Sequence, residues 1–239
     1  MFEKICGLAI ILSIFSFTKA QNVTNGTWNI FNIRHNVNEN WNVFAEAQLR
    51  SLDFYNDFNY YEVKGGADRK LNKNYRLALG IGSYQTYSSD GNFTLPKSNN
   101  EFRIWPQLLI SHTLYNLKIE QRIRAEFRFN SNEYRNRFRY RLALLYPFGN
   151  ESKGYKPYQI FINNELFFTD TQKRFERNRI NVGFNFKVNS STTLQTGYIN
   201  QIDFKTDSKT RRNFIQLGVF YEIPNKKLIK RKEIDAQEN

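Results

Sequence analysis

Several residue types on which common protein classes depend are scarce in this chain. Its 239 residues include one cysteine, one methionine, two histidines and five prolines. A single cysteine excludes both a disulfide scaffold and a metal site built from cysteines. Two histidines add too few further ligands for a transition-metal site. We therefore predict no metal and no cofactor.

Long apolar runs are missing as well. A bilayer-spanning helix needs about 18 or more consecutive apolar residues, and no stretch of the chain reaches that length. The mean hydropathy of -0.64 agrees with this, so a helical membrane protein is excluded. Intrinsic disorder is excluded too, because aromatic residues make up 16% of the chain and disordered chains are poor in them.

The first twenty residues have the pattern of a secretory signal peptide. Lys4 precedes an apolar stretch over residues 5–17, and small residues stand at Thr18 and Ala20. This stretch is too short to span a bilayer but is typical of the central region of a signal peptide. We predict cleavage after Ala20, a barrel domain over residues 21–223, and an aperiodic periplasmic tail of basic and acidic residues over 224–239.

Polar and apolar residues alternate along almost all of the remaining chain. In residues 117–129, for example, aliphatic and aromatic residues alternate with lysine, arginine and glutamate, and only Gln121 breaks the apolar row. A period of two is typical of β-strands with two different faces. We count eleven such segments, at residues 27–35, 41–52, 58–70, 75–87, 99–114, 117–129, 135–146, 158–168, 174–187, 192–204 and 211–223.

The length of these segments favours strands that cross a membrane. Most have 11 to 14 residues, whereas strands in soluble proteins usually have about 5–6 and a bilayer-crossing strand needs about 9–11. We predict an all-β fold, a transmembrane antiparallel up-and-down β-barrel of about 10–12 strands. Even strand numbers are usual in such barrels, so one segment could be divided wrongly, or residues 21–26 could thread back through the lumen.

The connections suggest two different ends of the barrel. Residues 72–74, 115–116 and 189–191 form tight turns, whereas residues 53–57, 88–98 and 205–210 are longer. Short turns at one end and longer loops at the other are typical of outer-membrane barrels. The long connection at 147–157 falls in the short-turn series and does not fit this pattern.

Charge decides which face points outward. Arg135, Arg137, Arg139 and Arg141 share one face of a single strand. One such cation facing lipid at the bilayer midplane costs about 2–4 kcal/mol, so we predict that the charged rows line the lumen and the apolar rows contact outer-membrane lipid. A soluble, lipocalin-like periplasmic binding barrel, with its apolar rows inside and its charges outside, is the alternative.

The order of several short motifs resembles a known family. They include Glu101-Phe-Arg-Ile-Trp-Pro-Gln-Leu108, Arg137-Phe-Arg-Tyr-Arg141 and Leu194-Gln-Thr-Gly-Tyr-Ile-Asn-Gln201. The sequence between residues 28 and 223 is similar to the domain of unknown function 2490 family of bacterial outer-membrane proteins. The resemblance implies a β-barrel in the outer membrane of a Gram-negative bacterium and implies no activity.

The expected lumen carries the candidate functional residues. A network of arginine and carboxylate pairs could fill it, because the guanidinium fork binds carboxylates through two hydrogen bonds. An excess of arginine could instead favour a porin-like path for a small anionic solute. The candidate polar network consists of Glu101, Arg103, Glu120, Arg122, Arg124, Glu126, Arg128, Arg135, Arg137, Arg139, Arg141, Glu165, Arg177 and Arg179.

Other functions have weaker support. An outer-membrane lipid-modifying hydrolase would need a serine and a histidine within reach of each other, but His112 falls on the apolar row and the adjacent Ser111 must point the opposite way. We therefore predict that the protein is not an enzyme. The formal net charge of +13 could suggest nucleic acid as a partner, but export and an internal position of the arginines argue against it.

Overall fold

The computed structural model describes residues 25–130, 133–151, 154–171, 174–205 and 208–225. The predicted signal peptide at 1–20 lies outside the described residues, as does the predicted tail from residue 226 onward. Within the described ranges, no helix is long and apolar enough to cross a membrane.

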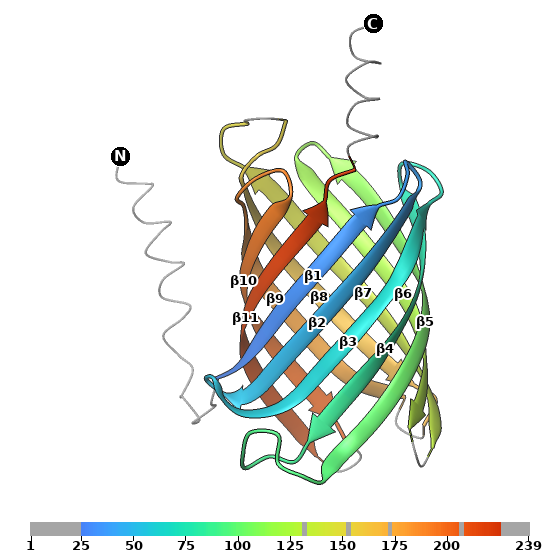
Figure 1. The fold of residues 1–239 in the computed structure, drawn as a ribbon, viewed down its shortest axis with the longest axis vertical. Coiled ribbons are helices and arrows are strands. Elements are labelled where there is room, and N and C mark those ends of the chain that lie inside the picture. The colour runs from blue at the N-terminus through green and yellow to red at the C-terminus, as the bar shows by residue number, and fades with distance from the viewer. Residues whose placement is uncertain (1–24, 131–132, 152–153, 172–173, 206–207, 226–239) are drawn as a thin grey trace, which may run out of the picture.

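Eleven strands make up the described fold. They are β1 (Asn25–Asn36), β2 (Trp41–Asp53), β3 (Asn56–Lys70), β4 (Tyr75–Tyr87), β5 (Lys97–Leu114), β6 (Leu117–Asn130), β7 (Tyr134–Phe148), β8 (Tyr158–Thr169), β9 (Phe175–Lys187), β10 (Thr192–Phe204) and β11 (Lys209–Ile223). They close into one barrel, as Figure 1 shows. The all-β barrel predicted from the alternation is therefore confirmed.

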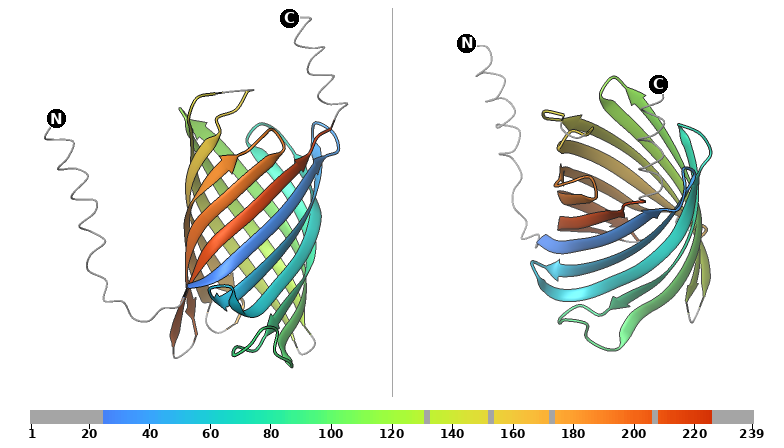
Figure 2. Two further views of the ribbon diagram at one scale, coloured as in Figure 1. Left: turned by 60° about the vertical axis from the view of Figure 1, so that its left-hand side comes forward. Right: turned by 45° about the horizontal axis from the view of Figure 1, so that its top comes forward.

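One strand pairing differs from the predicted antiparallel topology. Each strand pairs antiparallel with the next one along the chain, but β1 and β11 close the barrel in parallel, with Asn25 opposite Asn213 and His35 opposite Ile223. An odd number of up-and-down strands makes the first and last strands run in the same direction. Asn25 and Gly26 belong to β1, so this part of residues 21–26 does not thread through the lumen. Figure 2 shows β1 and β11 side by side from two further directions.

The parallel closure places the start of β1 and the end of β11 at opposite ends of the barrel (Figure 1). We call these ends the N rim and the C rim. The expected division into short turns and longer loops is wrong, because each rim has one nine-residue connection, 88–96 at the N rim and 149–157 at the C rim. Several strands extend one or two residues beyond their alternating segments, and this shortens the N-rim connections at 54–55 and 205–208.

The alternation separates two environments. The apolar rows lie on the outer surface, where Leu77, Leu79 and Ile81 of β4 are 47%, 58% and 51% exposed. The other rows point inward, and their buried members are mostly polar or charged. The interior of the barrel is therefore a polar layer held by side-chain contacts, and the sites described below are all within it.

Candidate functional site

The inward rows surround a cavity of about 690 Å3 to which all eleven strands contribute. Fifteen lysine and arginine side chains line it, against six aspartates and glutamates. Three further carboxylates, Glu101, Glu126 and Asp203, lie behind the lining and pair with it. The described lumen therefore has fifteen cations and nine carboxylates, an excess of six positive charges.

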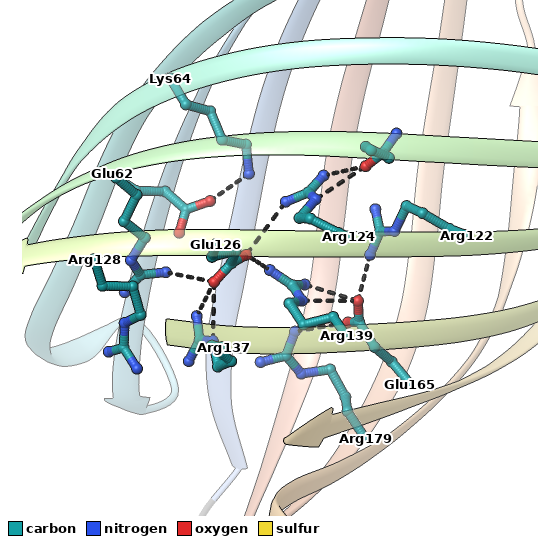
Figure 3. Close-up of polar contacts among 12 residues, drawn as sticks. Glu62, Lys64, Arg122, Arg124, Glu126, Arg128, Arg137, Arg139, Glu165 and Arg179 are labelled. Atoms are coloured by element: carbon teal, nitrogen blue, oxygen red, sulfur yellow. Dashed lines mark hydrogen bonds and ion pairs between the residues drawn. The ribbon is translucent and has the colours of Figure 1, made fainter. Parts of the chain in front are cut away.

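Glu126 of β6 is one centre of this network (Figure 3). Its Oε2 accepts hydrogen bonds from Nε and Nη2 of Arg137 at 2.9 and 2.6 Å, and its Oε1 accepts one from Nη1 of Arg139 at 2.5 Å. Arg103 and Arg124 add ion pairs at 3.8 and 3.6 Å. The carboxylate is 1% exposed, and it is surrounded by four guanidinium groups from three strands.

Glu165 of β8 is the second centre. Its Oε1 accepts hydrogen bonds from Arg139 at 3.1 and 2.8 Å and one from Arg122, and its Oε2 accepts one from Arg179 at 3.4 Å. Arg139 therefore bridges Glu126 and Glu165, as Figure 3 shows. Such bridging fixes the positions of three neighbouring strands relative to one another inside the barrel.

Two further clusters lie beside these centres. Glu101 of β5 accepts hydrogen bonds from Nε of Arg103 at 2.8 Å and from Nη2 of Arg128 at 3.1 Å. On β3, which is separated from β5 only by β4, Nζ of Lys64 lies 2.5 Å from Glu62 and 2.6 Å from Glu46. Most lumenal carboxylates therefore contact two or more cations, so the network neutralises the carboxylates but leaves some cations in excess.

The remaining residues of the predicted network lie toward the rims. Arg177 pairs with Asp203, and Glu120 pairs with Lys118 at 2.6 Å. Arg141 lines the cavity, but Arg135 does not; it pairs with Glu133 at 3.1 Å and is the most exposed of the four arginines on β7. The expected ladder of four lumenal arginines on β7 therefore has three members in the cavity wall.

Comparison with known proteins adds one match. The family model described as "Protein of unknown function (DUF2490)" matches residues 25–226. The chain is a member of the DUF2490 family. No curated protein and no solved structure matches the chain. The matched range begins with β1 and ends just after β11, so it covers the complete barrel of this DUF2490 protein.

The lumen of the DUF2490 barrel also has an aromatic layer that the alternation did not reveal. Trp105 lies between the backbone of Gly80, where an added Cβ would meet its ring at 2.1 Å, and the guanidinium of Arg124, 3.9 Å from the ring centroid. The Trp28 ring lies 3.4 Å from Arg50 and 4.6 Å from Arg179. The sequence signal for this layer was the presence of apolar residues in an otherwise polar row. An aromatic ring in a charged row can stack on a guanidinium group.

His112 and Ser111 lie on different faces of β5. His112 is exposed on β5, whereas the adjacent Ser111 faces a second cavity at the C rim. In the ranges that the structure describes, no group of three or more histidine, cysteine, aspartate and glutamate side chains is arranged to hold a metal ion. The chemistry offered by the described lumen is electrostatic and consists of guanidinium groups, carboxylates and amides around a cavity.

Proposed function

We propose that this DUF2490 barrel spans the outer membrane of a bacterium after export and removal of its signal peptide. Its outward rows are apolar, and outward aromatic pairs occur near both rims, such as Phe175 with Phe204 at the N rim and Tyr158 with Phe186 at the C rim. An apolar band between two aromatic girdles suits a bilayer with its two interfaces. A soluble lipocalin-like barrel would need its apolar rows inside.

Outward polar side chains also fit this proposal. Gln121 accepts a hydrogen bond from Tyr140 at 2.9 Å, and Asn200 donates one to Asn213 at 2.6 Å. Polar groups that face hydrocarbon need such partners, because an unpaired group there has no water to bind.

For the lumen, we propose that it binds or passes small anions. The observation that carries this proposal is the excess of six cations in the described lumen, counted over the cavity wall and the three carboxylates behind it. A cationic cavity with low-dielectric walls concentrates anions and repels cations. The protein needs no catalytic group for this role.

The size of the cavity limits the solute. A volume of about 690 Å3 falls within the range of about 300–1,000 Å3 that is typical of small-molecule sites. The arginine–carboxylate clusters occupy much of the remaining lumen, as expected for a barrel between the filled eight-stranded size and the open porins of about 16–18 strands. The proposal is thus a narrow, selective lumen rather than a general diffusion pore.

Planar-bilayer recording with the purified, folded chain tests this function. In a KCl gradient, we expect small conductance steps and a reversal potential displaced toward the equilibrium potential of chloride. A reversal potential displaced toward that of potassium would contradict the proposal. Folded protein that inserts without conductance and binds no anion would favour a purely structural barrel.

A further inference from the structure

We propose that Arg122 and Arg141 form a binding site for a small oxyanion, a carboxylate or a phosphate, in the lumen about midway along β6 and β7. The inference rests on the proposed anion-binding lumen and names the class of ligand and the side chains that hold it.

The two arginines face each other across a strand pair. Arg122 of β6 lies directly opposite Arg141 of β7, and both line the cavity. Side chains directly opposite in an antiparallel pair have Cβ atoms about 4.5–5.5 Å apart, and like charges there are destabilising. Such a pair is stable only where negative charge lies close to both groups.

We call each pair of directly opposite arginines on β6 and β7 a rung. The neighbouring rung has that negative charge. Arg124 lies directly opposite Arg139, and Glu126 approaches both, at 3.6 Å and 2.5 Å. That pair of arginines therefore has one carboxylate of the protein in contact with both guanidinium groups.

At the Arg122–Arg141 rung the nearby carboxylates are already paired. Glu165 lies opposite Arg141 in the register, but its ion pairs are with Arg122, Arg139 and Arg179. The ion pair of Arg141 within the described residues is with Glu120, at 3.9 Å, and Glu120 is 2.6 Å from Lys118.

Both arginines also keep an unused donor. Nε of Arg122 and Nε of Arg141 are buried, and no group in the described part of the protein accepts a hydrogen bond from either. Arg122 directs Nη2 to Glu165, so its charge is shared between this rung and that carboxylate. The two arginines therefore bring positive charge to the cavity wall and keep one buried N–H donor each without a partner in the described part of the protein.

The cavity that contains the two arginines adjoins another cavity at the C rim. A second cavity of about 460 Å3 lies there, lined by Lys70, Lys73, Arg76 and Lys118, with Glu120 as the only carboxylate in its lining among the described residues. Both cavities share Arg76, Lys118, Glu120 and Leu109 in their walls. An anion that enters at the C rim thus meets cations along the way to the rung.

Guanidinium chemistry selects the ligand class. The planar fork of arginine matches two oxygens of a carboxylate or phosphate, whereas chloride offers no paired oxygens. Two opposed forks should therefore prefer an oxyanion over a halide of equal charge. Because the shared chemistry is the pair of oxygens, inorganic phosphate and butyrate are the two probes.

Calorimetric titration of the folded, full-length protein in detergent tests the site. Phosphate, butyrate and chloride are titrated into the unmodified protein, Arg141→Gln and the control Arg135→Gln, which makes the same charge change on the same strand outside the cavity wall. We expect at least one oxyanion to bind more tightly than chloride. Arg141→Gln should weaken that binding by about tenfold or more, the effect of one charge-assisted hydrogen bond, and Arg135→Gln should leave it unchanged.

The outcomes separate the ligands and the two proposals. Binding of phosphate alone or of butyrate alone supports the site and assigns its ligand. If chloride binds as tightly as the oxyanions, or if both variants weaken oxyanion binding equally, the proposed site is wrong. A diffuse positive field in the lumen would then explain the binding. If bilayer currents remain anion-selective in that case, the proposed function stands without the site. If Arg141→Gln does not fold, Arg141→Lys keeps the charge without the fork, and the same weakening is expected.

Discussion

Arg139 illustrates how a buried charge in this lumen depends on more than one partner. It donates hydrogen bonds to Glu126 on β6 and to Glu165 on β8. Its own strand, β7, lies between these two strands. A side chain in this position contributes to stability mainly by preventing two buried carboxylates from losing a partner.

Replacing Arg139 by alanine should therefore destabilise the barrel. We expect a loss of about 3–5 kcal/mol, the range for breaking a buried ion pair by removing one partner, measured by denaturant unfolding in detergent. Arg135→Ala is the control, because Arg135 is outside the cavity wall and should change the unfolding free energy by about 0.5 kcal/mol or less. If Arg139→Ala leaves stability unchanged but reduces anion preference in bilayers, Arg139 contributes to anion selectivity and not to the stability of the barrel.

Gly80 offers a test of the aromatic layer. A Cβ at this position would lie 2.1 Å from the Trp105 ring, and the ring is held on its other side by Arg124. Gly80→Ala should destabilise the protein by about 1–3 kcal/mol through overpacking and should shift tryptophan emission toward that of an exposed indole. Ala47→Val, which adds carbon atoms on the exposed outer row of β2, should leave both measurements unchanged.

At the scale of single strands, the outer rows decide whether the barrel contacts lipid. Ile81 lies in the middle of β4 and is 51% exposed on the outer face. Ile81→Arg should weaken folding into lipid vesicles by about 2–4 kcal/mol, the effect of a cation near the bilayer midplane. Leu71→Arg, in the turn after β3, places an equal charge at the C rim and should have little effect. Equal, small effects of both changes would favour a soluble barrel.

The strands themselves were predictable from the sequence, each within two residues of its observed bounds. Alternation defines a strand well where its faces meet different surroundings, as in residues 75–87, which match β4. The parallel pairing of β1 with β11 was not predictable in this way, because alternation within a strand contains no information about its distant neighbour. The predicted loop lengths were wrong for a related reason, because strands such as β3 and β11 extend into residues without clear alternation.

The lumen was predictable in composition but not in its pairings. The sequence pattern identifies which arginines share a face, yet the choice of Glu165 to pair with Arg122, Arg139 and Arg179 rather than Arg141 depends on the reach of each side chain. Asp203 and Glu176 pair with lumenal arginines and were absent from the predicted network. Both lie near strand ends, where alternation is a weak guide.

For the whole molecule, the parallel closure makes a topological prediction. Residues 88–96 connect strands at the N rim, and residues 115–116 form a turn at the C rim. If the barrel spans a membrane, these two sites must lie on opposite sides of it.

Thiol labelling of intact cells can measure this arrangement. The only cysteine of the chain, Cys6, lies in the predicted signal peptide, so Thr94→Cys and Asn116→Cys would each introduce a single thiol. We expect an impermeant reagent to label one of the two before the outer membrane is permeabilised and both of them afterwards. Equal labelling of both in intact cells would contradict a membrane-spanning barrel.

The seam between β1 and β11 also bears on how the chain folds. Every other strand pairing joins consecutive strands through a short connection, but the seam pairs Asn25 with Asn213. Closing so large a loop costs chain entropy that local hairpins avoid, and contacts of this kind form slowly. A nascent sheet of eleven strands would therefore have two unpaired edges until its last step, and this late intermediate is the state of the protein most open to misassembly.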